Sequence, residues 1–265
     1  MNALFARHAL LPEGWRGDVL VEWDARGALT RVQADARAPI GVPRADYVVP
    51  GMANLHSHAF QRVLGGLTEH AGDGPDSFWT WRELMYRFAA TITPEQAEAI
   101  AAQLFSECLR HGYTSLCEFH YIQRDPAGEL YARPAEMAER IAAAGQQSGI
   151  GLTLLPVLYS HSGFGEQALK PEQRRFRTDV DTVLRIVEAL APLRSGQLEV
   201  GAAPHSLRAA GIAQIRELAA ALPKDRPLHI HIAEQQGEVE QSLAFSGRRP
   251  VEYLLENIGI DERWC

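Results

Sequence analysis

The hydrophobic pattern changes its period once along the chain. Between residues 18 and 32, apolar and polar residues alternate as in half-buried strands, and the turn-forming sequence Asp24-Ala-Arg-Gly27 interrupts the alternation. From residue 48 onward, short apolar runs alternate with longer segments of helical period, which is typical of βα units around a parallel sheet. The pattern predicts a small β domain over residues 1–47, built of hairpins, and an α/β domain over residues 48–265.

The α/β part contains five apolar runs that we expect to form strands. They cover residues 48–56, 114–121, 153–160, 198–206 and 227–234. The clearest helix lies between the first two, because Thr93-Pro94-Glu95-Gln96 combines a capping box with proline at the first helical position, and Gly112 ends the helix after His111. Further helices are predicted over residues 134–144, 178–190, 212–222 and 250–257.

The spacing of these strands limits the folds that the chain can adopt. They begin about 45 residues apart on average, so a sixth strand is expected to begin near residue 270. A closed barrel of this type needs eight parallel strands. An open doubly wound sheet would carry a glycine-rich phosphate loop after its first strand, where this chain has His56-Ser57-His58. We therefore expect the first five or so βα units of a longer (β/α)8 TIM-type barrel, and no turnover from these residues alone.

Composition and charge exclude several classes of function. The chain has 265 residues, 46% of them hydrophobic, and a net charge of −7, without the basic stripe that nucleic-acid-binding proteins normally carry. No apolar run approaches the ~20 residues of a membrane span, and the first residues do not resemble a signal peptide. The loosely spaced Cys108, Cys117 and Cys265 favour a reducing compartment over a disulfide framework. We expect a cytoplasmic protein without nucleic-acid or membrane partners.

Histidines at two strand ends are candidates for a metal site. His56 and His58 close the first predicted strand and, being two residues apart, face the same side. His231 ends the fifth, and active sites of barrel enzymes form where the strands end. Neutral imidazoles at such a place suit zinc. His229 faces the same side one layer deeper, where a hydrogen-bonded core histidine is the better explanation.

The position of Glu234 indicates a different role. It follows His231 by three residues, an odd offset that would place it on the opposite face if the strand continued. We therefore expect Glu234 to lie in the loop above the strand. A carboxylate there is suited to moving protons beside a metal-bound water rather than to binding the metal.

Several motifs together resemble the amidohydrolase superfamily. The sequence of residues 49–58 resembles its first-strand signature, and His231-Ile-Ala-Glu234 resembles the fifth-strand signature of its mononuclear deaminase branch. The closer match, over essentially the whole chain, is to the formiminoglutamate iminohydrolases of histidine degradation. It is carried by residues 56–62, 78–82, 118–121, 205–208 and 231–234. This resemblance implies a zinc-dependent hydrolase with a barrel and a flanking β-sandwich, of which residues 1–47 would be the N-terminal part.

The resemblance also implies an activity and a set of site residues. The reaction is hydrolysis of N-formimino-L-glutamate to N-formyl-L-glutamate and ammonia, with Glu234 catalytic and one divalent ion, Zn²⁺ or alternatively Fe²⁺, on His56, His58 and His231. The family adds a histidine and a metal-binding aspartate after later strands. Two arginines would suit a dicarboxylate, because a guanidinium binds a carboxylate through two parallel hydrogen bonds. The residues that match substrate positions are Gln61, Arg82, Tyr121, His205 and Arg208.

Two alternative functions remain open at this point. A purine or pterin aminohydrolase of the same branch would share the histidines and Glu234 but would not need two arginines. An inactive truncated fragment would also retain the motifs.

The long connection after the first strand is rich in aromatic residues, namely Phe78, Trp79, Trp81 and Tyr86. We expect them to form an aromatic wall or lid over the site, with core packing or a homodimer contact as the competing explanations.

Overall fold

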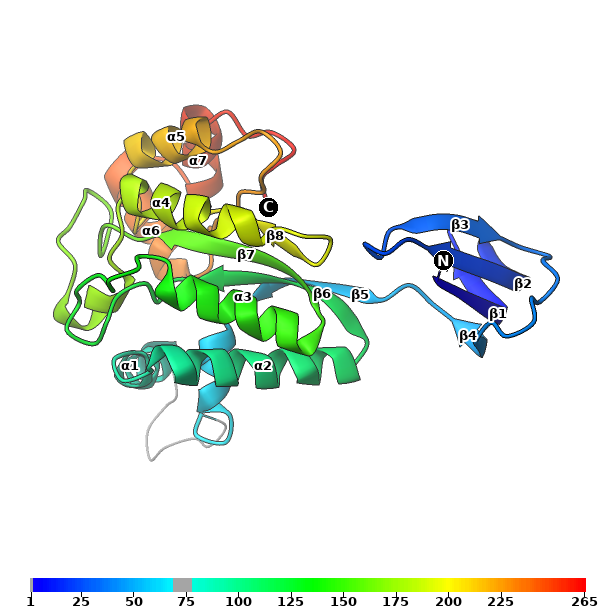
Figure 1. Ribbon diagram of the computed structural model, residues 1–265. Helices are drawn as coiled ribbons and strands as arrows, with labels where there is room; N and C mark the ends of the chain where they lie inside the picture. The colour runs from blue at the N-terminus through cyan, green and yellow to red at the C-terminus, as the bar shows by residue number, and fades with distance from the viewer. Residues whose placement is uncertain (1, 69–77) are drawn as a thin grey trace.

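The computed structural model describes residues 2–68 and 78–265, and Figure 1 shows two β-sheets that lie apart from each other. The N-terminal sheet has the order β3-β2-β1-β4, from β1 (Asn2–Leu11), β2 (Gly14–Trp23), β3 (Leu29–Gln33) and β4 (Arg44–Val48). The predicted hairpin is confirmed as β2 and β3, and Gly27 turns it with a φ of 83°. This sheet supplies one layer, and the second layer of a sandwich stays a prediction.

The second sheet is parallel and has the order β5-β6-β7-β8, with β9 also paired to β7. Consecutive strands are therefore neighbours, as in a βα barrel, and the predicted α/β fold class is confirmed. The strands are β5 (Met52–Ser57), β6 (Tyr113–His120), β7 (Gly151–Leu158), β8 (Leu198–Val200) and β9 (Ala203–Pro204).

Three of the predicted strands differ from the structure. The first, residues 48–56, begins later than predicted, because Val48 ends β4 of the other sheet and β5 starts at Met52. The fourth is divided at Gly201, which lies so close to the carbonyl oxygen of Pro227 that a side chain there would collide with it. The fifth, residues 227–234, is wrong as a regular strand, because it forms only isolated bridges at Leu228. Backbone hydrogen bonds still hold it in place, since His229 N donates to Ala202 O and His231 N to His205 O. On its other side it already pairs with residues 263–265, earlier than the sixth strand was expected.

Seven α-helices are seen in the described residues, and five of them match predicted ones. These five are α2 (Pro94–Arg110), α3 (Glu136–Ser148), α4 (Val180–Leu190), α5 (Ile212–Ala221) and α7 (Pro250–Asn257). The capping box of α2 is present, because Thr93 and Gln96 exchange backbone-to-side-chain hydrogen bonds. The sequence pattern missed α1 (Phe78–Ala89) and α6 (Gln236–Ser246). None of these helices is long and apolar enough to span a membrane.

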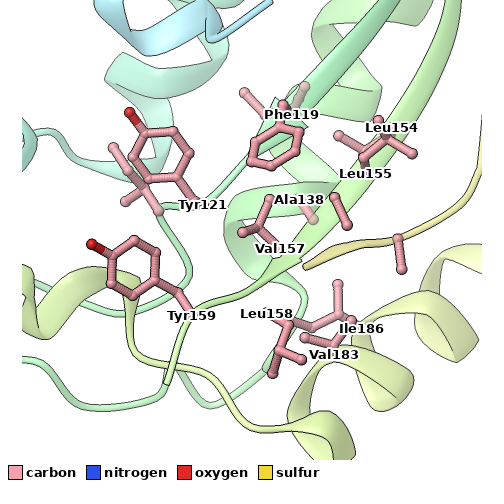
Figure 2. Close-up of a cluster of buried hydrophobic side chains, with 14 of the residues drawn as sticks. Phe119, Tyr121, Ala138, Leu154, Leu155, Val157, Leu158, Tyr159, Val183 and Ile186 are labelled. Atoms are coloured by element: carbon pink, nitrogen blue, oxygen red, sulfur yellow. The ribbon is translucent and has the colours of Figure 1, made fainter. Parts of the chain in front are cut away.

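The main core lies on both faces of β7. Figure 2 shows Leu154 and Leu158 among side chains of α3 and α4, and Leu155 and Val157 near Phe119 of β6. Burial on both faces is typical of a strand in a parallel sheet covered by helices. At the end of the same cluster, Tyr121 and Tyr159 follow β6 and β7 and mark the edge of the sheet at which the polar residues gather.

A buried arginine fixes the short helical connections around this edge. Arg175 lies in η2 (Pro171–Phe176) and is 1% exposed. Its guanidinium donates to the carbonyl oxygens of Ala89, Ile92 and Arg124, so it ties η2 to the end of α1 and to the connection after β6. The guanidinium group of Arg175 therefore takes the place of water as the hydrogen-bond donor to these carbonyl groups of the two connections.

We expect Arg175→Met to lower the free energy of unfolding by about 2–4 kcal/mol, because three buried carbonyl groups lose their donor. Denaturant unfolding of the full-length gene product measures this loss. The matched control is Arg174→Met, since Arg174 also donates to two carbonyl oxygens but is exposed, so water can replace it. Equal stability of the two variants would contradict a structural role for Arg175.

Candidate metal and substrate site

Three histidine rings meet where the strands of the second sheet end. His56 lies in β5, His58 follows it directly, and His231 comes from the segment beside β9, so the backbone brings together residues that lie 175 positions apart. The Nε2 atom of His56 is 3.1 Å from that of His58 and 3.2 Å from that of His231. Among the described residues this is the one group of three or more potential ligands close enough to hold an ion, with all ligand atoms within 4.8 Å.

Hydrogen bonding cannot account for both of the short contacts. The His56 Nε2 atom carries either one proton or one lone pair in the ring plane, so it can satisfy only one neighbouring nitrogen. His58 Nδ1 lies 2.9 Å from the carbonyl oxygen of Phe119 and must donate to it, which leaves a lone pair on His58 Nε2. At least one pair of nitrogens is therefore left in unfavourable contact, and a cation between the rings would relieve it.

The spacing of the nitrogens suits a tetrahedral ion. Two nitrogens bound at ~2.0–2.1 Å at the tetrahedral angle lie about 3.3 Å apart, close to the two distances seen here. The bond from His58 to Phe119 is also the arrangement that metal-ligating histidines usually show, because it fixes the tautomer and the ring orientation. The donor set and the two spacings around His56 therefore fit a divalent metal.

Burial keeps these imidazoles in the form that binds metal. It lowers the pKa of His58 to about 3, and His56 and His120 add a smaller effect of the same sign. Burial also lowers the pKa of His231 to about 2, with further contributions from the two neighbouring histidines and from Arg208. Metal ligation requires neutral imidazole, so the cluster is prepared for it at neutral pH.

The cluster opens into a cavity of about 700 Å³, large enough for a small substrate. All nine residues singled out from the sequence line it: His56, His58, Gln61, Arg82, Tyr121, His205, Arg208, His231 and Glu234. Trp81 and Tyr86 of α1 also line the cavity and supply part of the expected aromatic wall. The side chains of Phe78 and Trp79 lie outside what the structure describes.

Glu234 lies in a loop at the edge of the cavity, as its odd offset from His231 predicted. Ala233, with a φ of 56°, turns the chain between them. The Glu234 side chain is 41% exposed, and its Oε2 atom is 3.9 Å from Nη2 of Arg208. Carboxylate and guanidinium therefore face each other without a hydrogen bond, which leaves both available to a substrate.

A second carboxylate, which sequence reasoning missed, supports the positions of Glu234 and Arg208. Glu238 lies in the first turn of α6, is 2% exposed, and accepts a 3.1 Å hydrogen bond from the backbone N–H of Glu234. Its Oε2 atom is 4.0 Å from Nε of Arg208. Burial raises the pKa of Glu238, and the guanidinium of Arg208 opposes that rise. The loop of Glu234 and the side chain of Arg208 thus share one buried anchor.

Aromatic and amide side chains complete the cavity wall. Tyr121 accepts a 2.9 Å hydrogen bond from Nε2 of Gln61. The His205 ring lies between those of His231 and Tyr159, with centroid distances of 5.0 and 4.6 Å. Sequence reasoning did not single out the lining residues Met85, Tyr159, Phe176, Ile230 and Ile232. The place of Tyr159 at a strand end was the available signal for it.

Comparisons with known proteins agree with this geometry. The sequence profile of the amidohydrolase family matches residues 47–261. Formimidoylglutamate deiminase of Pseudomonas aeruginosa is 52% identical over 100% of this chain and 59% of its own length. A 5-methylthioadenosine/S-adenosylhomocysteine deaminase of Haloarcula marismortui is 28% identical over 80% of this chain and 43% of its own length. This chain therefore spans less than two thirds of either relative.

Two solved structures show the same fold. An amidohydrolase from Brucella melitensis is 46% identical, with a TM-score of 0.93 over 100% of this chain and 59% of its own. An adenosine deaminase from Xanthomonas campestris, solved with bound zinc, is 22% identical, with a TM-score of 0.71 over 99% of this chain and 56% of its own. At that identity the likeness concerns the fold alone.

Proposed function

Because the chain belongs to the amidohydrolase family, we propose that the full-length protein hydrolyses N-formimino-L-glutamate to N-formyl-L-glutamate and ammonia. The observation that carries this proposal is the set of residues that line the cavity. The three-histidine cluster lines it together with Glu234, Arg82 and Arg208. Two guanidinium groups beside a hydrolytic centre suit a small dicarboxylate. The 52% identity to formimidoylglutamate deiminase supports the same substrate.

Zinc, and a cytoplasmic location, are part of the proposal. His56, His58 and His231 would hold the ion, and the zinc in the adenosine deaminase of the same fold supports this choice. When bound, zinc lowers the pKa of a water molecule to about 7 and so supplies hydroxide at neutral pH. The contribution of this chain beyond the ligands is to orient the substrate and to move protons.

Glu234 is placed for the proton transfer. In the overall reaction water adds to the formimino carbon, the bond from that carbon to the imino nitrogen breaks, and the nitrogen leaves as ammonia. Converting the imino =NH group to ammonia takes two protons, so both protons of the water must reach the departing nitrogen. The Glu234 carboxylate faces the cavity and forms no side-chain hydrogen bond to Arg208, so it can accept each proton in turn and deliver it.

The direct test of the function is ammonia release by the purified, zinc-supplied full-length gene product. Formiminoglutamate is expected to be hydrolysed and guanine is not, because a purine offers no carboxylate to Arg82 and Arg208. Release of ammonia from guanine but not from formiminoglutamate would instead establish a purine aminohydrolase.

Arg208→Met is expected to raise KM for formiminoglutamate roughly 30- to 1,000-fold, because a charge-assisted, two-point contact with a carboxylate contributes about 2–4 kcal/mol. Zinc content should stay unchanged, since Arg208 is not a member of the histidine cluster. Steady-state kinetics and metal analysis measure the two quantities. Arg216→Met, which removes an exposed guanidinium bound to Asn257 O, is the control. An unchanged KM with loss of zinc would assign Arg208 a structural role instead.

A further inference from the structure

Tyr159 lies in the cavity wall without a role in the reaction described above. It follows β7 directly, as Tyr121 follows β6, and Figure 2 shows both rings at the same end of the core with their hydroxyl groups away from it. Its side chain is 6% exposed and lines the cavity. A buried hydroxyl at this place needs hydrogen-bond partners, and their identity decides what it can do.

Gln173 is one of the hydrogen-bond partners of the Tyr159 hydroxyl. Gln173 lies in η2, is 1% exposed, and its Oε1 atom accepts a 2.9 Å hydrogen bond from the backbone N–H of Lys170. A backbone N–H can only donate, so the atom facing it must be the amide oxygen, and the orientation of the amide is determined. The amide nitrogen therefore faces Tyr159, and donates to its hydroxyl oxygen over 2.8 Å.

This donation sets the direction of the Tyr159 proton. The hydroxyl oxygen accepts from Gln173, so its single hydrogen must be directed elsewhere, and the hydrogen bonds of the described residues give it no acceptor. Burial raises the pKa of Tyr159, so the hydroxyl stays protonated. The other amide hydrogen of Gln173 points toward the hydroxyl of Tyr86, at a longer 3.5 Å. Within the described part of the chain, the cavity wall thus presents an O–H donor that meets no protein acceptor.

We propose that Tyr159 is a further substrate-binding residue, whose hydroxyl donates to a carboxylate of the substrate, and that Gln173 is the positioning residue that directs it. The inference rests on the proposed function and deepens it. Arg82, Arg208 and Tyr159 line the same cavity. A carboxylate held there by either guanidinium would therefore share this space with the Tyr159 hydroxyl.

Tyr159→Phe tests the contact, because phenylalanine keeps the ring and removes only the hydroxyl. For formiminoglutamate we expect kcat/KM to fall about 10- to 100-fold, mainly through KM, as for a hydrogen bond to a charged group. The loss should disappear for the analogue that lacks the carboxylate in question. N-formimino-4-aminobutyrate lacks the α-carboxylate and N-formimino-2-aminobutyrate lacks the side-chain carboxylate, so the pair identifies which group is bound.

The matched control is Tyr131→Phe. The Tyr131 hydroxyl accepts a hydrogen bond from Arg175 and does not line the cavity, so its loss should leave all three substrates unaffected. Equal losses for the three substrates in Tyr159→Phe would show a structural effect and overturn the proposal. No loss for formiminoglutamate would overturn it as well.

Gln173→Met tests the positioning role. It removes the donor to Tyr159 while keeping a side chain of similar length, so kcat/KM for formiminoglutamate should fall in the wild-type background. In the Tyr159→Phe background the same change should have no further effect, because its effect passes through the hydroxyl. Additive losses in the double variant would contradict the role given to Gln173.

Binding of glutarate separates this inference from the proposed function. Glutarate is a dicarboxylate without a formimino group, and calorimetry measures its binding whether or not the protein hydrolyses any substrate. A 10- to 100-fold weaker Kd in Tyr159→Phe than in Tyr131→Phe, without turnover of formiminoglutamate by the wild type, would support the carboxylate contact and refute the function. Turnover by the wild type with no effect of Tyr159→Phe on Kd or KM would support the proposed function and overturn the carboxylate contact.

Discussion

Glu234→Gln is expected to lower kcat for formiminoglutamate by a factor of about 10²–10⁴, the usual contribution of a positioned proton-transfer group. Glutamine keeps the shape of the side chain and can still hydrogen-bond a water molecule, but it cannot accept a proton. Zinc content should hardly change, because the metal site is formed by three histidines. Stopped or continuous ammonia assays on the full-length gene product, together with metal analysis, measure both quantities.

The control for this variant is Glu240→Gln. Glu240 lies on α6 and is exposed, so the change removes an equal charge from the same region without touching the cavity. Its kcat should equal that of the wild type. Loss of zinc in Glu234→Gln, with activity restored by excess metal, would identify Glu234 as a ligand and contradict its proton-transfer role.

The second large effect is expected from His231→Asn, which should weaken metal retention more than about 100-fold and abolish turnover. Changing a residue that only supports a ligand already costs 10–100-fold in affinity, and here a ligand itself is removed. The asparagine also leaves only the imidazoles of His56 and His58 from the described cluster, and each lost ligand weakens a metal site. Zinc content after dialysis and a competition titration with a chelator measure the loss.

His229→Asn is the matched control, because His229 is a buried histidine two residues away that is not part of the cluster. It should retain zinc. If both variants lose zinc equally, the effect is a collapse of the segment they share, and the assignment of His231 as a ligand loses its support.

Local patterns predicted most of the fold. The capping box at Thr93 and the apolar runs of β6 and β7 depend on neighbouring residues alone, and the structure places these elements within a few residues of the prediction. Helix α6 was missed because its large apolar residues do not form one buried stripe: Leu243 and Phe245 are 44% and 52% exposed. Strand β1 lies within the region predicted as β, but its bounds were not predicted, because its residues do not alternate regularly and it is defined by pairing with β2 and β4.

Local sequence patterns likewise predicted some residues of the site and not others. His56 and His58 could be found because a spacing of two residues on a strand directs both rings to one side. Glu238 and Gln173 could not, since their roles depend on hydrogen bonds to loops and to a hydroxyl whose positions only the tertiary structure determines. Tyr159 lies between these cases: its strand was predicted, but the direction of its hydroxyl proton depends on Gln173.

The six-residue segment η2 links the stability of the fold to the wall of the cavity. Phe176 lines the cavity from it, Gln173 donates to the lining residue Tyr159, and Arg175 fastens it to α1, while none of the three belongs to the histidine cluster. The wall and the histidine cluster are therefore held by separate contacts. A substitution that loosens η2 should disturb the shape of the cavity before it disturbs the three histidines.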